Sequence, residues 1–174
     1  KWMLDRYDAV VAMRNVEASR KRDLLVTLFE KETHHFIKNE ILDQLMFDSH
    51  PKSIEVIRLA IKDSDARVRL NSLDALSQGL TPLVEDYEKL LTDSSYNVVK
   101  KALDQLSLAM PARVNNYLDI TKNEIGAVGK NVRVKWLEIA YINKNDNVYA
   151  SELVDYVSQS YEFRTRVNAV NALM

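Results

Sequence analysis

Apolar positions recur along the chain in one nine-residue pattern. In "VRLNSLDAL" (68–76) apolar residues occupy the first, third, sixth and ninth positions, and a small residue occupies the fifth. Five further windows follow this pattern, and they begin at Asp5, Ile37, Val98, Val132 and Thr165. Successive starts are separated by 32, 31, 30, 34 and 33 residues. A period in this range is typical of helical repeat arrays, so the pattern predicts one structural unit repeated along the chain.

The sixth and ninth positions define the face that each repeat helix is expected to bury. Spacings of three and four residues place such positions on one side of an α-helix. The sixth column is Val10, Leu42, Leu73, Leu103, Leu137 and Val170, and the ninth is Met13, Leu45, Leu76, Leu106, Ala140 and Leu173. The fifth column is small in four copies, as Ala9, Ser72, Ala102 and Ala169, which predicts close contact with a neighbouring helix. The mostly polar seventh column should point away from the buried face.

A second set of apolar-periodic segments lies between these windows, and all three prolines stand at their starts, as Pro51, Pro82 and Pro111. Proline at the first helical position loses no hydrogen bond, so each unit is predicted to be a helical hairpin. Residues 21–31 and 149–159 add two more first helices, while runs of alternating β-branched residues are absent. The predicted fold class is all-α: a right-handed α-α superhelix (solenoid) of about five to six hairpins, forming one domain over residues 1–174.

The hairpin pattern resembles that of HEAT repeats, a family of ARM-type α-superhelices. In that family a turn aspartate lies six residues before an arginine that follows a valine at the start of the second helix. Asp63 and Arg69 reproduce this arrangement, whereas Asp93 keeps the aspartate without the arginine. Arg133 and Arg166 keep the arginine without the aspartate. The resemblance implies a structural ladder of Asp63, Arg69, Asp93, Arg133 and Arg166, in which Arg69 pairs with turn carboxylates such as Asp63 or Asp65.

The same column of cations has an alternative interpretation as a binding stripe. A solenoid stacks equivalent residues at one per repeat, so the column could bind phosphate or carboxylate groups along a groove. The residues of this stripe would be Arg6, Lys38, Arg69, Arg133 and Arg166. The formal net charge of -1 argues against this alternative and against a nucleic-acid-binding protein.

The segment "WMLDRYDAVVAM" (2–13) resembles a junction in aminopeptidase-N-type (gluzincin) zinc metallopeptidases. In that family a tryptophan-bearing stretch and an Asp-Arg-x-x-Ala helix lead into a non-catalytic C-terminal helical domain. Trp2, Asp5, Arg6, Ala9 and Met13 carry the match. The resemblance implies that this chain covers the active site of a peptidase domain and limits substrate access, with zinc held by the parent chain. The alternative is a free-standing adaptor that binds a protein or peptide on its concave face.

Candidate chemistry within the chain is sparse. The zinc motif of that family needs two histidines four apart on a helix, and no His-Glu dipeptide exists here. His34 and His35 are adjacent, so on a helix their side chains should diverge by about 100°. His50 precedes a proline and is expected to have a surface or capping role. We therefore expect no catalytic residue, no metal ligand and no cofactor in this chain.

The amino-acid composition limits the possible classes of protein and its possible compartments. The chain has no cysteine, which excludes disulfides and thiolate chemistry and leaves the cytoplasm and the periplasm equally open. No apolar run is long enough to span a membrane. The densest basic run, "RNVEASRKR" (14–22), is expected to be a solvated helix end. Its alternative is a basic contact patch formed by Arg14, Arg20, Lys21 and Arg22.

The two ends suggest a piece of a longer polypeptide. The first residues, "KWMLDRYD", lack an initiator methionine and the apolar core of a signal peptide. The last helix, "FRTRVNAVNALM", carries apolar residues on a side that the preceding helix cannot cover. We therefore expect the natural chain to continue and the isolated chain to self-associate or fray there. The expected partners are preceding domains of the same polypeptide or a separate protein or peptide, with no nucleic acid and no membrane.

Overall fold

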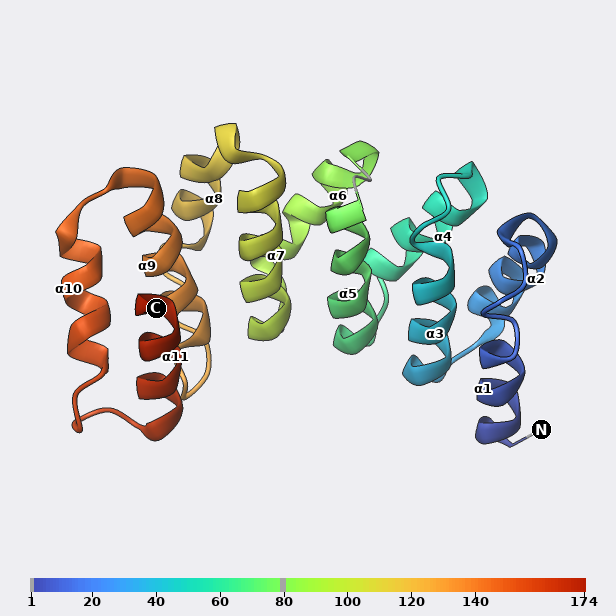
Figure 1. Cartoon of the computed structure of the whole chain (residues 1–174), viewed down its shortest axis with the longest axis horizontal. Coiled ribbons are helices and arrows are strands. Elements are labelled where there is room, and N and C mark those ends of the chain that lie inside the picture. The colour runs from blue at the N-terminus through green and yellow to red at the C-terminus, as the bar shows by residue number, and fades with distance from the viewer. Residues whose placement is uncertain (1, 79–80) are drawn as a thin grey trace. The chain divides into compact units, whose positions relative to one another are not determined.

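The computed structural model describes residues 2–78 and 81–174, and within these residues the chain is helical without a β-strand (Figure 1). This confirms the predicted all-α class. The chain divides into two compact units, Lys1–Asp86 and Tyr87–Met174. The single domain over residues 1–174 and the right-handed superhelix stay predictions.

The first unit consists of two helical layers. Its helices are α1 (Met3–Val11), α2 (Ala18–Lys31), α3 (His35–Leu45), α4 (Pro51–Ile61) and α5 (Ala66–Ser72), and α5 runs on as a 3-10 helix over Leu73–Gln78. Helix α3 packs against both α1 and α5, and α2 packs against α4. A 3-10 turn (Thr81–Leu83) and α6 (Val84–Glu88) follow, and the boundary between the units lies within α6.

The second unit repeats this arrangement. It consists of a 3-10 turn (Lys89–Thr92), α7 (Tyr96–Ala109), a 3-10 turn (Pro111–Arg113), α8 (Val114–Thr121), α9 (Asn131–Lys144), α10 (Asn147–Tyr156) and α11 (Phe163–Leu173). Helix α9 packs against both α7 and α11. Helices α8 and α10, which precede and follow α9 in the chain, also pack against it. We call the helices that carry the nine-residue pattern, α1, α3, α5, α7, α9 and α11, the second helices.

Pro51 and Pro111 begin helical segments as predicted, whereas Pro82 is the second residue of one. Pro51 is the first residue of α4. The Nδ1 atom of His50 caps that helix by accepting a hydrogen bond from the Lys52 amide at 3.2 Å. Pro111 opens a 3-10 turn, and Pro82 lies within one. The continuous helix expected after Pro82 is instead a succession of 3-10 and α turns. A proline presets φ, but it does not select between the hydrogen-bond pattern of a 3-10 helix and that of an α-helix.

The predicted buried columns form the core of the middle repeats. Leu42, Leu73, Leu103 and Leu137 of the sixth column are at most 1% exposed. Ser72, Ala102 and Ala169 of the fifth column are also buried, as expected for close helix contact. At the ends the prediction fails: Ala9 of α1 is exposed, and Val170 and Leu173 of α11 are 41% and 43% exposed. Within the described chain no second helix precedes α1 or follows α11, so these residues have nothing to pack on.

Trp136 occupies the fifth position of α9, which is a small residue in four of the other repeats. Its indole is 8% exposed, and Nε1 donates a hydrogen bond to the carbonyl oxygen of Leu118 at 2.8 Å. The ring also meets Tyr149 edge-on at 5.7 Å, which joins α8, α9 and α10. By contrast, Trp2 is 84% exposed.

Candidate binding surface

The basic run at residues 14–22 folds back onto acidic groups of its own unit. Arg14 donates two hydrogen bonds to Glu40, at 2.7 and 2.5 Å, and Glu40 is 4% exposed. Arg22 donates two hydrogen bonds to Asp48, at 2.5 and 3.1 Å. Of the four cations proposed as a contact patch, Arg14 and Arg22 are thus neutralised within the unit, while Arg20 is exposed.

Lys21 is the most buried of the four cations, at 6% exposed. Its ammonium donates to the carbonyl oxygens of Met13 and Arg14, at 2.9 and 3.0 Å, and to Oε1 of Gln44 at 2.9 Å. These carbonyl oxygens lie in the turn that follows α1. Lys21 therefore joins α1, α2 and α3 from the inside, and its ammonium is withdrawn from solvent.

The pKa directions in this network follow from these contacts. The Arg14 guanidinium lowers the pKa of the Glu40 carboxyl, against the effect of burial. Arg22 lowers the pKa of Asp48 to about 2, with help from Ser53 and the His50 amide. Burial lowers the pKa of Lys21. Both carboxylates are ionised at neutral pH and act as internal counter-ions, which is a structural role.

The predicted ladder residues also bind groups of their own chain. Asp63 accepts a hydrogen bond from Lys38 of α3 at 2.6 Å and from the amide of Asp65 at 2.8 Å. Arg69 donates to the backbone carbonyl oxygens of Asp63 and Ser64, at 2.7 and 3.1 Å. Arg69 thus holds the turn before α5 through backbone carbonyl oxygens. The cation that bonds to the Asp63 carboxylate from the preceding hairpin is Lys38.

The remaining ladder residues lie in the second unit. Asp93 accepts the Ser95 amide at 2.8 Å, which is the same turn geometry as at Asp63. Arg133 donates two hydrogen bonds to Glu152, at 2.9 and 2.6 Å, and stacks on Trp136 at 4.6 Å. Arg166 lies 5.8 Å from the Phe163 ring, and its buried Nε atom has no hydrogen-bond partner among the described residues.

The two adjacent histidines do not diverge as expected. His34 precedes α3 in an extended conformation and His35 is the first helical residue, so the helical angle between side chains does not apply. Their rings stack with centroids 5.0 Å apart and planes 17° apart. Among the described residues, no group of three or more histidine, aspartate or glutamate side chains could hold a metal ion. None of the helices in the described ranges has the length and apolar character needed to cross a bilayer.

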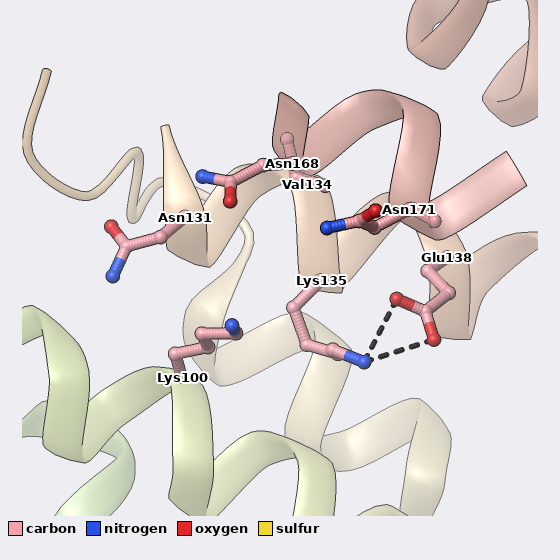
Figure 2. A pocket seen from close by; sticks show the side chains of 8 residues that line it. Lys100, Asn131, Val134, Lys135, Glu138, Asn168 and Asn171 are labelled. Carbon is pink, nitrogen blue, oxygen red and sulfur yellow. Dashed lines mark hydrogen bonds and ion pairs between the residues drawn. The ribbon is translucent and has the colours of Figure 1, made fainter. Parts of the chain in front are cut away.

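A small polar cavity of about 150 Å³ lies over the second helices of the second unit (Figure 2). Its lining comes from α7, α9 and α11: Lys100, Asn131, Val134, Lys135, Glu138, Asn168, Asn171 and Ala172. Most of these residues hold the third, fourth and seventh positions of the repeat. Figure 2 shows Lys100 and Lys135 extending along one side of the cavity, with Asn168 and Asn171 of α11 on the other.

Several polar groups of this cavity are already used within the unit. Lys135 pairs with Glu138 at 2.8 Å and with Asp104 at 3.2 Å. Asn168 donates its side-chain amide to the carbonyl oxygen of Gly129 at 2.7 Å. Asn131 donates to Asn97 at 3.1 Å. Among the residues that the structure describes, the Lys100 ammonium makes no ion pair, so it is available to a ligand.

This cavity was not predicted from the amino-acid pattern, although the pattern contains a signal for it. The polar seventh column was correctly expected to lie off the buried face. The fourth position holds Glu40, Asn71, Lys101, Lys135 and Asn168, and it is equally polar. Together the fourth and seventh columns indicate a polar face on the second helices, separate from the cations of the second column.

No model of a known protein family matches this chain, and no curated protein matches it either. The likeness to aminopeptidase-N-type enzymes therefore rests on Trp2, Asp5, Arg6, Ala9 and Met13. Arg6 has a structural partner here, because it donates two hydrogen bonds to Glu32 at 2.9 and 3.1 Å.

Proposed function

We propose that this chain is a non-catalytic helical scaffold that binds a polypeptide segment on the polar face of α7, α9 and α11. The observation that carries this proposal is the polar cavity with its available Lys100 ammonium. A volume of about 150 Å³ suits one side chain, whereas sites for small organic ligands usually measure about 300–1,000 Å³.

The polar side-chain groups of the cavity that are available to a ligand indicate the chemistry of the bound segment. The Lys100 ammonium offers donors and a positive charge, which suits an aspartate or glutamate side chain. The Asn168 side-chain oxygen is an acceptor, and the Asn171 amide is both donor and acceptor. Backbone N–H and C=O groups of an extended segment satisfy such amides. The proposed ligand is therefore an extended segment that places an acidic side chain at Lys100.

Binding of matched peptides tests this proposal. The probes are fluorescein-labelled Gly/Ser peptides with a central Asp, Asn or Lys, measured by fluorescence anisotropy at low salt. We expect the Asp peptide to bind best and Lys100→Gln to weaken it roughly tenfold, since a charge-assisted hydrogen bond contributes about 1.5–3 kcal/mol. Lys122→Gln, an exposed lysine after α8, serves as the matched control. Equal binding of the three peptides, or equal effects of both variants, would contradict the proposal.

A second form of this function follows from the aminopeptidase resemblance. In it the chain is the C-terminal part of an aminopeptidase-N-type metallopeptidase, packs on its catalytic domain and limits substrate access, while the parent chain holds zinc. The exposed Trp2 and Leu4, at 84% and 64%, favour this form because they give the segment that carries the resemblance an apolar contact surface. Sequencing the gene upstream of Lys1 tests it: a His-Glu-x-x-His motif is expected a few hundred residues earlier, and a nearby start codon contradicts it.

A further inference from the structure

Large apolar side chains recur two residues beyond the nine-residue pattern, where three of the second helices end. This eleventh position holds Phe47 in the repeat of α3, Leu108 in that of α7 and Ile142 in that of α9. These side chains are 73%, 74% and 75% exposed. In the repeats of α1 and α5 the same position holds Asn15 and Gln78. Scattered exposed apolar residues are ordinary, whereas apolar residues gathered on one face mark an interaction surface.

The exposure of these residues does not come from the place where the sequence begins or ends. Helix α9 packs between α7 and α11, and α3 packs between α1 and α5, each within its own unit. A further repeat before α1 or after α11 would pack on the outer face of a terminal helix. It would leave Leu108 and Ile142 as exposed as they are here, so any group that covers them is of another kind.

Leu108 and Ile142 belong to the same polar face as the cavity at Lys100. Leu108 follows Asp104 by four residues and Ile142 follows Glu138 by four, a spacing that places each pair on one side of its helix. Lys135 pairs with both carboxylates, at 3.2 Å to Asp104 and 2.8 Å to Glu138 (Figure 2 shows the second pair). The two stripes therefore meet where α7 and α9 pack together. We call Leu108 and Ile142, one turn further along these helices, the apolar shelf.

The separation between Lys100 and the apolar shelf matches an extended polypeptide. Leu108 follows Lys100 by eight residues, which is about 12 Å along the helix axis. An extended chain advances about 3.3 Å per residue, so four residues span about 13 Å and return the side chain to the same side. Four residues of a helical ligand would advance only about 6 Å. The spacing therefore favours an extended segment over a helix.

We propose that the polypeptide segment bound on this face carries a large apolar residue four positions from its acidic residue, and that the apolar shelf binds it. The inference rests on the proposed peptide-binding function and adds a second anchor to it. The Lys100 ammonium selects the acidic side chain, and the shelf selects the apolar one. The distance between the two anchors selects the spacing, so the ligand is an extended acidic and apolar segment of this pattern.

Leucine-containing versions of the labelled Asp peptide test the spacing by fluorescence anisotropy at low salt. One peptide has leucine four residues after the aspartate and one has it four residues before, because the separation fixes the spacing without fixing the chain direction. A third has leucine three residues away, where an extended chain turns it to the opposite side. We expect at least one four-residue peptide to bind roughly tenfold more tightly than the leucine-free peptide, and the three-residue peptide to gain little.

The combined variant Leu108→Ser with Ile142→Ser tests the shelf itself. Both side chains are about three-quarters exposed, and circular dichroism checks that the fold is retained. We expect this variant to lose the gain from leucine. On the same variant, the leucine-free Asp peptide reports the Lys100 contact by itself. Val154→Ser, at a 60% exposed position of α10, is the matched control and should keep the full gain.

Failure of the shelf and failure of peptide binding at the cavity give different results. Binding of the leucine-free Asp peptide through Lys100, with no gain from leucine in either order, overturns the shelf and leaves the cavity as a peptide site. Equal binding of all peptides, with no effect of Lys100→Gln, overturns both. A gain that survives the combined variant overturns the shelf, because leucine then binds elsewhere. Self-association of the unmodified chain that the combined variant abolishes also overturns it, by assigning the shelf to a second copy.

Discussion

The Arg22 guanidinium and the Asp48 carboxylate form a two-bond ion pair in which the side chains are 17% and 13% exposed. The pair connects α2 to the turn after α3. Because Arg22 lowers the pKa of Asp48 to about 2, from about 3.9 for a free aspartate, the native state gains stability from the ionised form. This contribution is fully present above about pH 4 and is lost as the pH falls through about 2.

Urea denaturation across the acid range checks this linkage. The free energy of unfolding should decrease by about 2 kcal/mol through Asp48 alone between pH 5 and pH 2. Arg22→Met should reduce stability at pH 5 and flatten this dependence, because Asp48 then loses the partner that lowers its pKa. Arg20→Met, a change at the neighbouring exposed arginine, should keep the original pH profile. Parallel profiles for Arg22→Met and the unmodified chain would show that the pair contributes nothing to acid stability.

Replacement of the buried Lys21 should be far more damaging than replacement of Arg20. Lys21→Met removes three hydrogen bonds and leaves the carbonyl oxygens of Met13 and Arg14, in the turn after α1, without their donor. We expect a loss of ~1–3 kcal/mol in chemical denaturation. Arg20→Met should change stability by less than ~0.5 kcal/mol. Similar losses from both changes would mean that the Lys21 contacts do not stabilise the unit.

The core register can be checked in the second unit. Leu103 is fully buried at the sixth position of α7, so Leu103→Ala should cost ~2–5 kcal/mol through lost burial and the cavity that remains. Asp119 is exposed on α8, and Asp119→Ala should stay within ~0.5 kcal/mol of the unmodified chain. Thermal and urea denaturation measure both variants, and comparable losses would show the register to be wrong.

Gly126 lies close against the first turn of α9. Its φ is +88°, and a Cβ atom there would lie 2.3 Å from Asn131 Oδ1 and 2.9 Å from the amide nitrogen of Val132. Gly126→Ala should therefore destabilise the chain by ~1–3 kcal/mol. Gly129→Ala meets only side-chain and more distant atoms and should cost less. Hydrogen exchange at the first turn of α9 reports the local effect, and unchanged protection in Gly126→Ala would contradict this role.

The basic run at residues 14–22 should not bind nucleic acid. Arg14 and Arg22 pair with acidic side chains and Lys21 is buried, so few charges remain to release counterions from phosphates. We expect no salt-dependent shift with single- or double-stranded DNA or RNA in an electrophoretic assay. Micromolar binding that disappears with Arg20→Ala, Lys21→Ala and Arg22→Ala would contradict this expectation.

The sequence by itself determined the all-α class, the hairpin boundaries at Pro51 and Pro111, and the buried columns of the middle repeats. These features follow from local periodicity, because spacings of three and four residues select one face of a helix wherever that helix packs. The burial of Leu42, Leu73 and Leu103 was predictable for this reason. Their equivalent on α11, Val170, is also apolar, yet it is 41% exposed because no second helix follows α11 in the described chain.

Tertiary structure decided which charged groups meet. Arg14 and Glu40, like Arg22 and Asp48, are 26 residues apart, and no local pattern assigns such a partner. A run of cations that suggested a contact patch is therefore largely an internal network. The Lys100 cavity likewise exists only because α7, α9 and α11 bring their polar columns together. Pairing energy and burial depend on distance in space, and the sequence gives that distance only after the hairpins have packed.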